Sequence, residues 1–227
     1  MSEFTVHSIP GSPFGRSALA TLEEKGASYR LAPLVPGSLK TPEYLKLHPF
    51  GRVPVLEHDG FMLYETQAIL RYLDRALPQA PLTPSDAKRA ARMDQAMNVN
   101  DWYLFNGVGN VIIFHRVIGP RVLGLAPDEE AIKAAMPKAQ AVFNELARLL
   151  GAQPYFAGEE LSLADLMLAP QIEFFTIIPE WSVLGTPHDN LVSWMKRMQD
   201  RPSMKATTWE RVSELAKGHV KGHVKAA

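Results

Sequence analysis

The sequence predicts a small α/β domain followed by an all-α domain. From Phe4 to about Leu77, short β-rich runs alternate with short helical patterns. Three prolines then follow within seven positions, at Pro78, Pro81 and Pro84, and a helix does not continue through such a spacing. Beyond these prolines we find only helical patterns. We therefore expect a first domain at 1–77, a linker at 78–84, a helical domain at 85–217 and a tail at 218–227.

The first domain begins with the order strand, helix, strand, which implies a parallel crossover between its first two strands. In chain order, the expected elements are a strand at 4–8, a helix at 14–26, a strand at 29–34, one or two helical turns at 42–47, strands at 53–58 and 61–64, and a helix at 66–77. Gly26 is a stop signal for the first helix. Asp59-Gly60, between the last two strands, is a strong hairpin signal.

The second domain is expected to be helical throughout. Its helical patterns run from 85 to about 107 or beyond, at 128–150, from 163 to about 178, at 190–201 and near 205–217. Ser162 and Asp165 have the spacing of a capping box, and Leu161 and Leu166 are placed as a hydrophobic staple. We interpret these four residues as folding signals rather than as catalytic groups.

Composition excludes several classes of function. Apolar residues are 46% and charged residues 21% of the chain, which is typical of a globular protein. Lys+Arg and Asp+Glu are 24 each, and the formal net charge of +0 argues against nucleic acid as a partner. The absence of cysteine excludes disulfides, thiolate metal sites and a protein thiol as nucleophile. The first residues lack a signal-peptide pattern and no stretch reaches ~18 apolar residues, so we expect a cytoplasmic protein with no membrane partner.

Ser12 is the first candidate for chemistry. It follows the first strand and precedes a helix, with Pro13 at the expected first helical position. A serine N-cap followed by proline is a common helix start, so a purely structural role fits. The same geometry places a hydroxyl and free N–H groups at a helix N-terminus, where they can stabilise a thiolate or another anion. The residues alone leave both interpretations open.

Two further segments place polar groups at strand ends. A cis Pro54 would turn the backbone N–H and C=O of Val53 outward, toward a peptide-like ligand, although cis is not the default for an X-Pro bond. Thr66 follows Glu65 where a strand gives way to a helix, so its hydroxyl and the helix N–H groups face an incoming carboxylate. A plain N-cap role for Thr66 is the alternative.

The other candidates are weak on the residues alone. Lys40 lies in the loop 37–42, where a surface lysine needs no functional explanation. His219 and His223 are four residues apart and could share a metal ion, but a solvated tail is the better interpretation. We therefore expect no metal site.

Three motifs give the chain a resemblance to the glutathione S-transferases. They are Pro49-Phe-Gly-Arg-Val-Pro-Val-Leu56, Leu63-Tyr-Glu-Thr-Gln-Ala-Ile69 and Leu161-Ser-Leu-Ala-Asp165. Their order and spacing together are specific, and the resemblance runs from Phe4 to roughly Met204. It implies a thioredoxin-like N-terminal domain, an all-helical C-terminal domain and usually a homodimer. It also implies an enzyme that conjugates reduced glutathione, its co-substrate, to electrophiles.

The resemblance assigns a role to each candidate residue. In the Ser-type classes a serine just after the first strand activates the glutathione sulfur, and Ser12 occupies that place. A serine four residues before an arginine, as in Ser12 and Arg16, is similar to the pattern of the plant-type phi class. The triplet Ser-Pro-Phe that begins at Ser12 is similar to the pattern of the tau class. The remaining roles are pairing of the Val53 backbone with the cysteinyl unit, with Pro54 cis; binding of the γ-glutamyl amine and carboxylate by Glu65 and Thr66; and contact of Lys40, together with Arg52, with the glycine carboxylate.

The chain departs from the phi pattern at three positions. Leu39 stands where phi-class proteins often have His, Arg52 where they usually have Gln, and Thr66 where they usually have Ser. Threonine keeps the hydroxyl, whereas loss of the histidine leaves the glycine end of glutathione less well held.

The expected function is therefore a glutathione transferase that acts on small hydrophobic electrophiles. A glutathione-dependent isomerase or dehalogenase would use the same thiolate, and a non-catalytic binding or scaffold protein would share the architecture. A thiol–disulfide reductase is disfavoured, because Ser12 cannot form a mixed disulfide. Aromatic candidates for the electrophile pocket, which could equally be plain core, are Trp102, Tyr103, Phe105 and Phe114.

Overall fold

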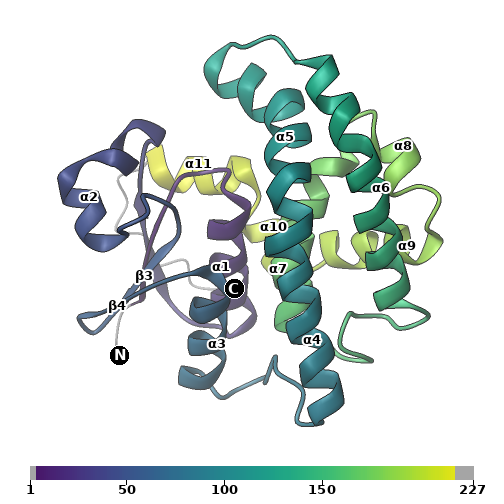
Figure 1. The fold of residues 1–227 in the computed structure, drawn as a ribbon. Coiled ribbons are helices and arrows are strands. Elements are labelled where there is room, and N and C mark those ends of the chain that lie inside the picture. The colour runs from purple at the N-terminus through teal and green to yellow at the C-terminus, as the bar shows by residue number, and fades with distance from the viewer. Residues whose placement is uncertain (1–3, 218–227) are drawn as a thin grey trace. The chain divides into compact units, whose positions relative to one another are not determined.

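The computed structural model describes residues 4–217, so the tail with His219 and His223 lies outside the described residues. Contacts divide the chain into two compact units (Figure 1). The first unit consists of the described residues of Met1–Leu82 and Gln199–Ala227, and the second is Thr83–Met198. No helix within the described range is long and apolar enough to cross a membrane.

The first unit is built on a four-stranded sheet with the strand order β2-β1-β3-β4. Its elements are β1 (Phe4–Ser8), α1 (Pro13–Glu24), β2 (Tyr29–Pro33), a 3-10 turn (Pro36–Lys40), α2 (Pro42–Leu47), β3 (Val55–His58), β4 (Phe61–Tyr64), α3 (Thr66–Ala76), α10 (Pro202–Ala206) and α11 (Trp209–Lys217). β1 pairs with β2 in parallel, and β3 pairs antiparallel with both β1 and β4. The expected crossover and hairpin are both present, and the result is a thioredoxin-like domain.

The core of this unit lies between the sheet and the two helices α1 and α3. Val6 of β1, Leu22 of α1 and Ile69 of α3 are fully buried in one apolar cluster. Helix α3 is amphipathic, since Leu73 joins this cluster while Arg75 is exposed. Burial of an aliphatic side chain of this size contributes about 1.5–3 kcal/mol. The core therefore fixes both helices, and with them the loops that join them to the strands.

The C-terminal helices belong to this first unit, which differs from the domain bounds expected from the sequence. Helix α10 contacts α1, α11 contacts β2, and Val212 of α11 is buried in the same core cluster. The single helix expected near 205–217 is also wrong, because the chain leaves the helix after Ala206. Thr208 then caps the start of α11: its hydroxyl accepts the N–H of Arg211 at 3.3 Å.

The second unit is all-helical, as expected. Its elements are α4 (Ala87–Val99), a π-helical stretch (Asn100–Gly109), α5 (Asn110–Ile113), a second π-helical stretch (Phe114–Leu123), α6 (Glu129–Leu150), α7 (Leu163–Thr176), α8 (Trp181–Leu184) and α9 (Asp189–Gln199). The helix breaks near Gly107, where the first pattern was expected to end: Gly107 has φ 78° and Asn106 has ψ 113°. Beyond this break the chain is helical again as far as Leu123. Lys138 of α6 donates to the Asn106 carbonyl, and Asn110 accepts the Gly107 N–H. These polar contacts specify the break.

Asp165 is a fully buried carboxylate at the start of α7. It accepts the backbone N–H and the hydroxyl of Ser162, at 2.9 and 2.7 Å. It also accepts the N–H of Phe156 at 3.0 Å and the indole N–H of Trp194 at 2.9 Å. Burial raises the pKa of Asp165, and these hydrogen bonds oppose that rise. The residue therefore joins three segments of the unit, which extends the capping role expected from the sequence.

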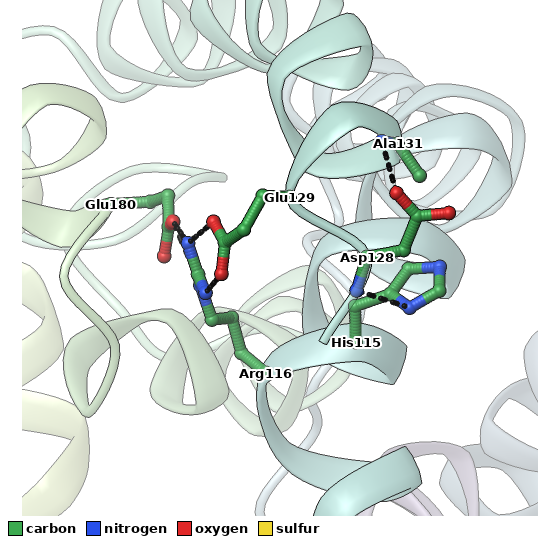
Figure 2. A network of polar contacts seen from close by, with 6 residues as sticks. All are labelled: His115, Arg116, Asp128, Glu129, Ala131 and Glu180. Atoms are coloured by element: carbon green, nitrogen blue, oxygen red, sulfur yellow. Dashed lines mark hydrogen bonds and ion pairs between the residues drawn. The ribbon is translucent and has the colours of Figure 1, made fainter. Parts of the chain in front are cut away.

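Arg116 of the second π-helical stretch joins two other segments (Figure 2). Its guanidinium donates to Glu180 at 2.7 and 2.9 Å and to both carboxylate oxygens of Glu129, the first residue of α6. Beside it, Asp128 caps α6 by accepting the N–H of Ala131 at 2.9 Å. The long loop between residues 123 and 129 is thus fixed at the end where α6 begins.

Candidate active site

The candidate residues of the first unit gather at one end of its sheet, and the strand register shows why. His7 lies opposite Val55, Val55 lies opposite Tyr64, and Ser8 lies opposite Pro33. The chain therefore leaves β1 and β2, enters β3 and leaves β4 at the same end of the sheet. The segments that follow or precede these strand ends carry Ser12, Lys40, Val53 with Pro54, and Glu65 with Thr66.

Ser12 is placed by a tight turn and by the helix that it caps. The Ser12 N–H donates to the Ile9 carbonyl at 3.0 Å, with Pro10 and Gly11 in between. Gly11 has φ 86°, so the turn fits type II, which requires glycine at this position. The Ser12 Oγ accepts the Gly15 N–H at 3.2 Å, and Pro13 begins α1. An oxygen that accepts this bond still carries a hydrogen, which it can donate to an anion.

Gly15 holds the first turn of α1 tightly against the end of β1. A Cβ at this position would lie 1.9 Å from the Ser8 Oγ, so no side chain fits there. The sequence analysis did not single out Gly15, because its role depends on how closely a strand end and a helix approach each other. This close packing holds in place the first turn of α1 and the backbone N–H groups that follow Ser12.

The loop before β3 contains a cis peptide bond between Val53 and Pro54, as the family resemblance implied. Tyr44 of α2 donates its hydroxyl to the Arg52 carbonyl at 2.6 Å. Gly51 has φ 60°, and its N–H donates to the His48 carbonyl at 2.9 Å. Two hydrogen bonds, one from α2 and one within the loop, therefore hold the backbone just before Val53.

Gly51 also brings Lys40 to this loop. A Cβ on Gly51 would lie 2.6 Å from the Leu39 carbonyl oxygen and 3.3 Å from the Lys40 Nζ. The ammonium group of Lys40 thus lies beside the residue that precedes Arg52, and both cationic side chains are exposed. An exposed ammonium group at this loop favours the binding of a carboxylate.

Glu65 and Thr66 form the start of α3 with an unusual backbone. Glu65 has φ 73° and ψ 115°, a conformation that a residue with a side chain adopts at a cost of about 1–3 kcal/mol. Its carbonyl accepts the Ile69 N–H at 3.0 Å, while its side chain is exposed. Thr66 is buried at the first position of the helix. Strain of this kind is concentrated at functional sites.

His48 is a buried residue of this loop that the sequence analysis missed. Its ring lies 4.7 Å from that of Tyr64 and 6.1 Å from that of Phe50. Burial lowers the pKa of His48; the charge of Glu65 opposes this effect and that of Arg52 adds to it. The available signal was its position directly before Pro49, the first residue of the first of the three motifs.

The aromatic candidates for an electrophile pocket lie in the second unit. Trp102 and Tyr103 are 67% and 56% exposed, so they are not core residues. Phe105 and Phe114 are half-buried. Among residues 4–217, no group of three or more His, Asp or Glu could hold a metal ion.

The fold defines the class of protein: a thioredoxin-like domain joined to an all-helical unit. Residues 6–81 match the family model for the glutathione S-transferase N-terminal domain, and residues 129–197 match that for the C-terminal domain. The chain belongs to the glutathione S-transferase family of enzymes, which use glutathione as co-substrate and are typically dimeric.

Known proteins resemble this chain over most of its length. It is 35% identical to glutathione S-transferase F14 of Arabidopsis thaliana, over 82% of this chain and 76% of the relative. It is similar in structure to glutathione transferase F2 from Populus trichocarpa, with a TM-score of 0.82 and 26% identity over 92% of this chain and 99% of that one. A glutathione S-transferase I bound with the ligand lactoylglutathione has a TM-score of 0.79 and 27% identity over 93% and 99% of the two chains.

Proposed function

We propose that this protein conjugates reduced glutathione to small hydrophobic electrophiles and that Ser12 stabilises the glutathione thiolate. The observation that carries the proposal is the position of three features at one end of one sheet. They are the Ser12 helix start, the cis bond before Pro54 and the strained turn at Glu65. The relative bound with lactoylglutathione supports glutathione, rather than another thiol, as the ligand.

Ser12 and its helix are sufficient to ionise the thiol. A free thiol has a pKa of ~8.5, and lowering it by 1.5–2 units requires about 2–2.7 kcal/mol. One hydrogen bond to a charged group contributes about 1.5–3 kcal/mol. A helix N-terminus adds about 0.3–1 kcal/mol. No general base is therefore needed, and Ser12 acts by donating its hydrogen.

The other candidates bind the peptide part of glutathione. The backbone of Val53 pairs with the cysteinyl unit, because Val53 precedes β3 and takes no part in the pairing of β3 with β1. Glu65 and Thr66 hold the γ-glutamyl amine and carboxylate at the N-terminus of α3. Lys40 and Arg52 bind the glycine carboxylate without the histidine that phi-class proteins often have at position 39.

The proposal includes the oligomeric state: the active form is a homodimer that binds glutathione and an electrophile. The cytoplasmic location stays a prediction. Isomerisation or dehalogenation would need the same thiolate, so an electrophile panel distinguishes these reactions from conjugation. A protein that is not retained on immobilised glutathione and does not react with a chlorodinitrobenzene-type electrophile would be a binding or scaffold protein instead.

The decisive experiment compares Ser12→Ala with the wild type. Removal of the donor should raise the pKa of bound glutathione by about one to two units, because the hydroxyl supplies about 1.5–3 kcal/mol. Turnover at pH 7 should fall about ten- to a hundredfold and recover in part at higher pH. Thiolate absorbance of the binary complex and the rate are both followed against pH.

Ser17→Ala is the matched control. The Ser17 hydroxyl lies on the same helix, is fully buried and donates to the Pro13 carbonyl at 3.0 Å, so it has no access to a ligand. This variant should titrate like the wild type. Coincident thiol titrations for Ser12→Ala and the wild type would instead disprove the role of Ser12. The affinity of Ser12→Ala for glutathione should be unchanged, because the peptide contacts remain.

A further inference from the structure

The turn that carries Ser12 is covered by an aromatic ring from the other end of the chain. Trp209 is the first residue of α11, and its indole packs against Gly11. A Cβ on Gly11 would lie 2.4 Å from the indole Cε2, 2.7 Å from Cδ2 and 2.8 Å from Nε1. Position 11 therefore requires glycine for two reasons, its positive φ and the ring that occupies the space of a side chain.

The segment that contains Trp209 is firmly attached to α1, the helix that Ser12 caps. Near the start of α1, Arg16 donates to the Met204 carbonyl at 2.9 Å. At the end of α1, Glu24 accepts two hydrogen bonds from the Arg201 guanidinium, both at 2.7 Å. Val212, one helical turn after Trp209, is buried in the core of the first unit. Figure 1 shows α11, in yellow, with the N-terminal elements.

These contacts restrict the conformation of the turn. Glycine reaches both positive and negative φ with little penalty, so within the Pro-Gly turn the peptide before Ser12 is restricted mainly by its hydrogen bond to the Ile9 carbonyl. A ring packed on the Gly11 backbone also opposes rotation of this peptide, and the attachments at Arg16 and Glu24 hold the ring in place. The direction of the Ser12 hydroxyl depends on this peptide, because Ser12 is the next residue.

We propose that Trp209 is a positioning residue for Ser12. Its indole holds the turn from Ile9 to Ser12 in the conformation that directs the Ser12 hydroxyl toward the glutathione sulfur. This inference rests on the proposed function of Ser12. It extends the active site to α11, which lies outside the residues 6–81 and 129–197 that the family models match.

The test measures the pKa of bound glutathione in three variants at position 209. Trp209→Ala removes the ring and should raise this pKa by about half to one unit, with a three- to tenfold fall in kcat/KM at pH 7. Trp209→Leu fills the volume without a flat surface and should show a similar rise. Trp209→Phe keeps a flat ring and should remain close to the wild type. Comparison of the leucine and phenylalanine variants keeps the test valid if the alanine variant does not fold.

Two controls separate positioning from general stability. Arg211→Ala removes an exposed side chain of the same helix and should leave the pKa of bound glutathione unchanged. A double-mutant cycle with Ser12→Ala is the sharper control. If Trp209 acts through Ser12, then Trp209→Leu should cause no further pKa change in a Ser12→Ala background.

The outcomes distinguish this inference from the proposal on which it rests. If Ser12→Ala raises the pKa of bound glutathione but Trp209→Leu does not, Trp209 only stabilises the fold, and the inference is wrong while the role of Ser12 stands. If the two effects add fully, Trp209 acts on the thiol independently and the positioning role is also wrong. If Ser12→Ala leaves the pKa unchanged, the role of Ser12 fails and the inference fails with it.

Discussion

Tyr44 shows how one buried side chain fixes the backbone that would bind a peptide. Its hydroxyl is 2.6 Å from the Arg52 carbonyl, and the next peptide unit belongs to Val53. Burial raises the pKa of Tyr44 to about 12, so the hydroxyl stays protonated and able to donate throughout the neutral range. The hydrogen bond from Tyr44 to the Arg52 carbonyl is therefore retained across the neutral range.

Tyr44→Phe should weaken glutathione binding without changing the chemistry of the thiol. Loss of one neutral hydrogen bond costs about 0.5–1.5 kcal/mol, so KM for glutathione should rise about two- to tenfold. The pKa of bound glutathione should match that of the wild type, because Ser12 is untouched. Tyr29→Phe is the control, since it removes another buried tyrosine hydroxyl, bound to Glu23 at 2.7 Å, from the same unit. An unchanged KM for Tyr44→Phe would separate this hydrogen bond from ligand binding.

At the scale of residues, the sequence predicts those functional candidates whose signals are local. Ser12 and Thr66 could be found because a polar residue between a strand and a helix is itself the signal of a helix start. Tyr44 and Trp209 could not, because each acts through a contact in space with a loop outside its own helix. The roles of the local candidates as glutathione ligands came from the resemblance and stay predictions.

At the scale of elements, one carboxylate, that of Glu24, contributes to the attachment of the C-terminal segment to α1. Burial opposes ionisation of Glu24, but hydrogen bonds from Arg201 and Ser203 and the Arg201 charge lower its pKa overall. A carboxyl group with a lower pKa in the folded state stabilises the fold above its unfolded pKa, and this contribution is lost as the pH falls through the folded value. The attachment should therefore weaken in acid.

Glu24→Gln should lower the free energy of unfolding by about 1–2 kcal/mol at pH 7, because charged hydrogen bonds in a half-buried site are lost. The difference from the wild type should begin to shrink as the pH falls below the unfolded pKa of about 4.3, and it should vanish below the lower folded pKa, where the wild-type carboxyl is protonated as well. Urea unfolding at a series of pH values measures both effects. Glu145→Gln, in the exposed pair with Arg148, should show no measurable change. A difference for Glu24→Gln that is independent of pH would rule out the ion pair as its origin.

The errors in the predicted elements have identifiable physical causes. The hairpin at Asp59-Gly60 was correct, because the turn chemistry is contained in two residues. The first helical pattern was expected to end near Gly107, where the break lies, but the helical stretch that follows was not defined. The contacts that stabilise the break come from Lys138 and Asn110, and helical periodicity does not show them. Likewise, only the Thr208 cap and the burial of Val212 reveal that the last pattern is two helices.

At the scale of the whole molecule, several large apolar side chains of the described residues are exposed in the single chain. Phe50 is 64% exposed, yet its ring is held edge-on to His48 and Tyr64, at 6.1 and 6.3 Å. Trp102 is 67% exposed. Rigid exposed aromatic residues are enriched at the centres of protein interfaces. Because members of the family are typically dimers, we expect these exposed side chains to contact a second copy of the chain.

We expect light scattering to give twice the chain mass of 25.2 kDa at micromolar concentration. Phe50→Ser should shift the mass toward the monomer, because loss of one central aromatic contact weakens association by about 2 kcal/mol, or roughly thirtyfold. Val35→Ser is the matched control: Val35 is 66% exposed in the same unit but is not aromatic, and its variant should stay dimeric. A wild-type mass near 25.2 kDa would refute the dimer. A dimer that survives Phe50→Ser would place the interface elsewhere, with Trp102 the next residue to test.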